Sequence, residues 1–143
     1  MKTLKITFFL ACTMVAMGGC LDNTGPEPTV ITEPSARSYY YIANQSESDL
    51  SVTYKIAFLP MDSTVAVPAD STTQIFESGG ISSSPSPSEA LANLRFYKLS
   101  GDTTSPIFTI EPVVDENWDV STEYVPGDAV TKYKLVVTEE DFN

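Results

Sequence analysis

Apolar and polar residues alternate most regularly over residues 50–59. The side chains on one side of this stretch are apolar: Leu50, Val52, Tyr54, Ile56 and Phe58. Polar side chains fall on the other side: Ser51, Thr53 and Lys55. A period of two in β-branched and aromatic residues predicts a strand with one buried face. We expect residues 39–43 to form the neighbouring strand, joined to it through a polar turn at residues 44–49.

Shorter stretches of the same kind follow, with turn signals between them. Residues 64–67 and 72–77 flank Pro68-Ala69-Asp70, and we expect them to form a hairpin. Residues 79–85 are rich in glycine and serine, which predicts an exposed loop. Trp118 is expected to pack in the core or at an edge. Further strands are expected at residues 94–99, 107–110 and 130–138.

A helix start interrupts these strands at residues 86–89. Ser86 is a favoured N-cap, Pro87 suits the first helical position, and Glu89 completes a capping box. About seven short strands and one brief helix, without internal repeats, predict an all-β fold. The spacing favours an immunoglobulin-like antiparallel β-sandwich over residues 38–143. Because the Cys-Trp-Cys pattern of true immunoglobulin domains is absent, only the architecture is predicted.

The first nineteen residues have the three parts of a secretory signal. Lys2 and Lys5 precede an apolar run at residues 6–17, and Gly18 and Gly19 precede Cys20. A run of about a dozen apolar residues is shorter than the roughly 20 that span a bilayer. A cysteine directly after small residues resembles the lipobox of bacterial lipoproteins, in which that cysteine is lipidated. We therefore predict a lipoprotein signal peptide at 1–19; the alternative is an ordinary secreted protein.

The segment after the signal has the composition of a linker. Pro26, Pro28 and Pro34 each lack a backbone donor, and few residues of the segment could be buried. We predict that residues 20–37 comprise the lipidated Cys20 and a disordered, flexible tether. The expected location is the cell envelope, anchored by lipid at the outer membrane, with the periplasmic or surface side left open.

Charge and composition exclude several classes of function. The chain has 19 acidic and 8 basic residues, a formal net charge of −11, and two of its lysines lie in the signal. Such an acidic surface is repelled by phosphates, which argues against a nucleic-acid partner. The chain has no histidine, so Ser-His-Asp and Cys-His catalysis and imidazole metal sites are excluded. We expect no cofactor and no enzymatic activity, although catalysis by paired carboxylates is unconstrained by the sequence.

An acidic stretch near residue 115 invites comparison with calcium loops. The first three oxygen ligands of such a loop are matched by Asp115, Asn117 and Asp119. Val120 replaces the required glycine and Pro126 replaces the bidentate glutamate, so the EF-hand pattern fails. A looser calcium site that uses Glu123 or Asp128 stays open, against the alternative of a solvated loop.

Three tripeptides, each an Asp followed by Ser or Thr and then by a small or apolar residue, fall in or beside predicted turns. Each resembles the acceptor motif for O-glycosylation of exported Bacteroidetes proteins. The acceptor hydroxyls would be those of Ser63, Ser71 and Thr103. A chain rich in serine and threonine also produces such motifs by chance, and a glycan there would add bulk rather than activity.

Two predicted strands carry side chains that must face outward. Tyr39, Tyr40 and Tyr41 cannot share one face, so either Tyr40 or the pair Tyr39 and Tyr41 points out. An outward ring could stack on a sugar or on a partner protein, or pack against neighbouring strands. In the last strand, Lys132 and Lys134 are expected to face outward.

Six short stretches carry a resemblance to a known group. They lie at residues 41–46, 75–80, 85–89, 96–98, 118 and 135–140. The chain is similar in these stretches to the small envelope lipoproteins of Bacteroidetes. The resemblance implies an envelope lipoprotein with a β-sandwich and brings no functional residues with it.

The leading hypothesis is a lipid-anchored, non-enzymatic binding or accessory module. Its partners would be the membrane, through the anchor, and an unidentified protein or glycan. The alternative is a structural or assembly component of an envelope complex without a ligand of its own.

Overall fold

The computed structural model describes residues 35–81, 83–100 and 104–142. Within these residues the chain forms eight strands and one α-helix, α1 (Pro87–Ala90). Two short 3-10 helices, η1 (Asp115–Asn117) and η2 (Glu139–Phe142), complete the regular structure. The strands are β1 (Ser35–Asn44), β2 (Leu50–Ile56), β3 (Asp62–Val67), β4 (Ser71–Ile81), β5 (Leu91–Lys98), β6 (Phe108–Ile110), β7 (Trp118–Val125) and β8 (Asp128–Val137).

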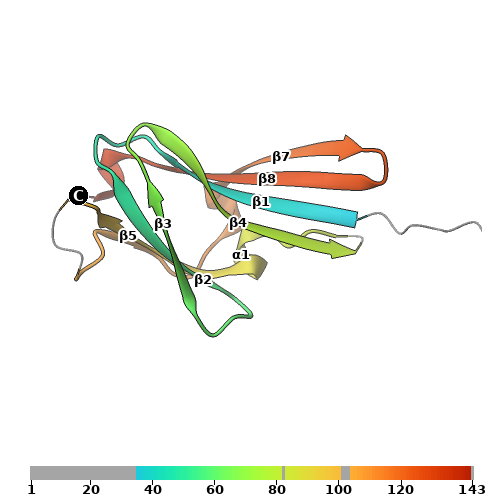
Figure 1. Cartoon of the computed structure of the whole chain (residues 1–143), viewed down its shortest axis with the longest axis horizontal. Helices are drawn as coiled ribbons and strands as arrows, with labels where there is room; N and C mark the ends of the chain where they lie inside the picture. The colour runs from blue at the N-terminus through green and yellow to red at the C-terminus, as the bar shows by residue number, and fades with distance from the viewer. Residues whose placement is uncertain (1–34, 82, 101–103, 143) are drawn as a thin grey trace, which may run out of the picture. The chain divides into compact units, whose positions relative to one another are not determined.

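The strands are arranged in two four-stranded sheets, which confirms the predicted all-β sandwich (Figure 1). The first sheet has the order β4-β1-β8-β7, and the second has the order β3-β2-β5-β6. Neighbouring strands are antiparallel except for β1 and β8, which pair in parallel at the centre of the first sheet. The first and last strands of the fold are therefore neighbours.

The core lies between the inward faces of the two sheets. Alternation places Leu50 and Val52 of β2 in it, as predicted, opposite Tyr40 and Ile42 of β1. Trp118 is also buried there and meets the Tyr40 ring edge-on, with 6.3 Å between ring centroids. Burying each large apolar side chain stabilises the fold by about 1.5–3 kcal/mol, so this cluster holds the two sheets together.

Two predicted strand pairings are wrong, because each predicted turn carries the chain from one sheet to the other. β1 pairs with β4 and β8, whereas β2 pairs with β3 and β5. The predicted hairpin around Pro68-Ala69-Asp70 likewise joins β3 of the second sheet to β4 of the first. Turn residues identify where a chain reverses, but they do not show whether the next strand joins the same sheet.

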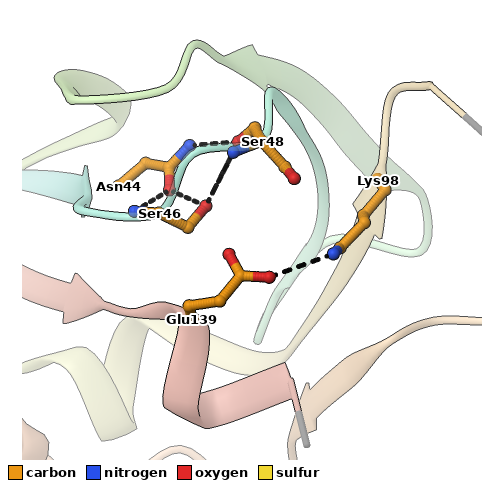
Figure 2. A network of polar contacts seen from close by, with 5 residues as sticks. All are labelled: Asn44, Ser46, Ser48, Lys98 and Glu139. Carbon is orange, nitrogen blue, oxygen red and sulfur yellow. Dashed lines mark hydrogen bonds and ion pairs between the residues drawn. The ribbon is translucent and has the colours of Figure 1, made fainter.

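A buried asparagine fixes the first of these crossings (Figure 2). The Asn44 amide nitrogen Nδ2 lies 2.9 Å from the carbonyl oxygen of Ser48, 3.2 Å from that of Val67 and 3.1 Å from that of Pro68. Its Oδ1 accepts from the backbone N–H and the hydroxyl of Ser46, at 3.0 and 2.7 Å. The Asn44 side chain thus joins the turn between β1 and β2 to the turn between β3 and β4.

Several element boundaries differ from the sequence-based expectation, and β7 was not among the expected strands. β1 begins at Ser35, inside the segment assigned to the tether. β4 continues through Gly79 and Gly80 to Ile81, although residues 79–85 were expected to be a loop. A side chain at Gly80 would bring its Cβ within 2.6 Å of the Ser83 carbonyl oxygen, so glycine there permits a close backbone approach. β2 ends at Ile56, which leaves Phe58 67 % exposed instead of buried.

The helix start is confirmed. The Ser86 N–H donates to Glu89 Oε2 at 2.9 Å, and Pro87 occupies the first turn of α1. None of the helices in the described part of the chain has the length and apolar character needed to cross a membrane.

Candidate functional site

The outward face of the first sheet carries the strongest candidate site, and β1 supplies its aromatic side chains. Tyr40 points into the core, so Tyr39 and Tyr41 point outward, which decides between the two predicted arrangements. The Tyr40 hydroxyl donates to the Pro85 carbonyl oxygen at 2.7 Å, and burial raises the pKa of Tyr40 to about 12. Its ring also stacks on Tyr133 with 5.4 Å between centroids. The inward ring therefore holds the outward pair in place.

The parallel pairing of β1 with β8 sets a lysine beside each outward tyrosine. Tyr39 lies opposite Lys132, and Tyr41 lies opposite Lys134. The sequence predicts that both lysines face outward, but it gives no signal that they neighbour the tyrosines. That neighbourhood depends on a pairing between segments more than 90 positions apart.

Strand β7 adds an acidic partner for each lysine. Lys132 Nζ lies 3.0 Å from Glu123 Oε1, and Lys134 Nζ lies 3.2 Å from Asp119 Oδ2. The hydrogen bond to Glu123 and then its negative charge raise the pKa of Lys132, so this lysine is positively charged at neutral pH. Within each pair the positive charge of the lysine is balanced by the negative charge of its acid, although the chain as a whole is strongly acidic.

A hollow of about 310 Å³ opens on this side of the sheet. Its walls combine an aromatic ring, two ammonium groups, a carboxylate and two hydroxyls, with one aliphatic side chain. The lining residues are Tyr41, Thr72, Asp119, Val120, Ser121, Lys132 and Lys134. We call these residues, together with Tyr39 and Glu123, the tyrosine–lysine face. A half-buried ring beside donors and acceptors can stack on an apolar ligand surface, while the neighbouring groups bind the ligand's polar atoms.

The carboxylates of the candidate calcium site lie apart and have other partners. Asp115 accepts from the backbone N–H and the hydroxyl of Ser88, at 2.8 and 3.0 Å. Partial burial alone would raise the pKa of Asp115, but these hydrogen bonds and one from Ser86 lower it overall. Asp128 accepts from the Ser35 hydroxyl. In the described ranges, no group of three or more acidic or cysteine side chains is placed to hold a metal ion.

The predicted modification sites are only partly within the described residues. Ser63 is the second residue of β3, an edge strand, and is half-buried. Ser71 begins β4, and its hydroxyl donates to the Pro68 carbonyl oxygen at 2.7 Å. Cys20 and Thr103 lie outside the described residues.

Comparison of the chain with profiles of protein families, with curated proteins and with solved structures found no match.

Proposed function

We propose that this protein is a lipid-anchored lipoprotein of the cell envelope and that its β-sandwich is a non-enzymatic binding module. The proposed ligand is a neutral saccharide, bound on the tyrosine–lysine face. The anchor would be Cys20, which follows an apolar run and two glycines. The observation that carries the binding proposal is the hollow in which the Tyr41 ring lies beside paired lysine and acidic side chains.

The chemistry of the face favours a neutral, hydroxyl-rich ligand. The accessible face of a half-buried tyrosine ring can pack against the C–H face of a sugar. Ammonium and carboxylate groups then donate to and accept from sugar hydroxyls. Each nearby lysine is already neutralised by an acid, Lys132 by Glu123 and Lys134 by Asp119. An anionic ligand would have to displace these carboxylates, whereas a neutral sugar can bridge both members of a pair.

Titration calorimetry of the purified protein with a panel of neutral oligosaccharides tests the binding proposal. We expect saturable binding that Tyr41→Ala weakens about tenfold, since one lost aromatic contact is worth roughly 1.4 kcal/mol. Tyr124→Ala is the matched control because that tyrosine is exposed at a different place in the same sheet. Equal weakening by both variants, or no saturable binding, would contradict the proposal. Co-purification with another envelope protein in fixed stoichiometry, without saccharide binding, would support a structural role instead.

Metabolic lipid labelling tests the anchor separately. The wild-type protein is expected to carry label, and Cys20→Ala is expected to lose it. Protease treatment of intact cells then shows whether the domain faces the medium or the periplasm.

A further inference from the structure

Three exposed apolar side chains lie at one end of the first sheet. Tyr124 is 85 % exposed, Ile81 is 70 % exposed and Val125 is 46 % exposed. Val125 lies opposite Asp128, and Ile81 lies opposite Ser35, so both belong to the last row across the sheet. Tyr124 belongs to the row next to it. We call Ile81, Tyr124 and Val125 the apolar tip.

Packing between the sheets does not explain these residues. Trp118 is the one buried residue of β7, and every later residue of that strand is exposed. β7 and β8 extend at this end beyond the second sheet (Figure 1). A ring such as Tyr124, left in water in the described structure, adds nothing to the core. Exposed apolar side chains that the core does not use, together at one end of a domain, are candidates for a contact surface.

The chain enters the domain at the same end. The Ser35 N–H donates to the Gly127 carbonyl oxygen at 3.2 Å, next to the β7–β8 turn, and Ser35 also lies opposite Ile81. Fifteen positions separate Cys20 from Ser35. Such a stretch spans at most about 50 Å when fully extended. The apolar tip is thus at the end of the sheet from which the chain leads back to the anchor.

We propose that the apolar tip enters the interface of the membrane that holds Cys20; this inference rests on the proposed lipid anchor. Tyrosine suits the interface between lipid and water because its ring is apolar and its hydroxyl stays hydrated. Asp128 lies in the last row beside Val125, whereas the nearby charges of Glu123 and Arg37 are paired with Lys132 and Glu77. Asp128 and the chain's formal net charge of −11 disfavour anionic headgroups, so the fitting surface is zwitterionic lipid.

Depth measurement by spin labelling tests the proposal in the full lipidated protein. The lipid blocks the Cys20 thiol, so Val125→Cys provides a single labelling site. Leu99→Cys is the matched control: Leu99 is 51 % exposed, and its N–H donates to the Asp49 carbonyl oxygen, beyond the far end of β1. A ten-residue strand places the two sites roughly 30 Å apart.

In phosphatidylcholine vesicles, the label at position 125 is expected to show a several-fold higher ratio of oxygen to nickel-chelate accessibility than the label at 99. Adding Tyr124→Ser and Ile81→Ser should return that ratio to the control value. Equal ratios at the two sites in protein whose mass shows lipid on Cys20 would overturn the proposal and leave the anchor intact. Spin–spin broadening at 125 would place a second copy at the tip and also overturn it. Absence of lipid from Cys20 would overturn both the anchor and this inference.

Discussion

Removal of the buried Asn44 side chain is expected to destabilise the domain by about 3 kcal/mol. Asn44→Ala deletes the donor that three carbonyl oxygens share and the acceptor that Ser46 uses. Each net hydrogen bond is worth about 1 kcal/mol, and buried groups left without a partner add to the loss. A domain of this size has a stability of about 5–15 kcal/mol, so the variant should still fold.

Urea unfolding at pH 7, followed by the fluorescence of the buried Trp118, measures this change. Gln45→Ala is the matched control: the neighbouring Gln45 side chain is exposed, and its loss should change stability by less than about 0.5 kcal/mol. Asn44→Asp has the same shape but sets a carboxylate against carbonyl oxygens. At pH 7, Asn44→Asp should lower the free energy of unfolding by more than Asn44→Ala does. At acidic pH the carboxyl is protonated, and the loss caused by Asn44→Asp should be smaller than at pH 7. A loss below about 1 kcal/mol for Asn44→Ala would refute the view that this side chain fixes the crossing between the sheets.

Three further changes have defined outcomes. Tyr40→Phe should cost about 1 kcal/mol in urea unfolding, because the hydroxyl that donates to Pro85 is lost while the stacked ring stays; no change would contradict a role for that bond. Asp115→Asn should cost about 1 kcal/mol at pH 7, a figure reduced for the partial exposure of the carboxyl. Because the folded pKa of Asp115 is lowered, its contribution is present above its ordinary pKa and lost as pH falls through the folded value; a cost that does not shrink toward pH 2 would contradict this. Gly127→Ala should cost about 1 kcal/mol, since Gly127 has a φ of +85° with nothing near its Cβ position; an unchanged thermal midpoint would contradict backbone strain as the cause.

The sequence predicts those parts of the fold that depend on neighbours along the chain. The alternation in β2 and the Ser86-Pro87 helix start are local signals, and both are confirmed. The pairing of β1 is not local, because its partners begin at Ser71 and Asp128. No periodicity within one strand encodes which distant strand it meets.

The same distinction applies to the candidate site. Alternation alone requires that Tyr39 and Tyr41 share a face. Nothing in the composition places Lys134 next to Tyr41, since that depends on the register of the parallel pair. The sequence does not predict the crossing at Asn44 for a related reason: an asparagine in a polar turn looks the same in sequence whether it is exposed or buried, and Asn44 is buried.

The parallel pairing of β1 with β8 also determines how the domain would respond to mechanical load. The two strands are in register from Ser35 opposite Asp128 to Asn44 opposite Val137. The start of β1 and the end of β8 therefore lie at opposite ends of the pair. A pull between them would load all ten residue pairs in shear at once, instead of unzipping them one after another. A protein held to a membrane at its N-terminal end and pulled at its C-terminal end would resist through its central pair of strands.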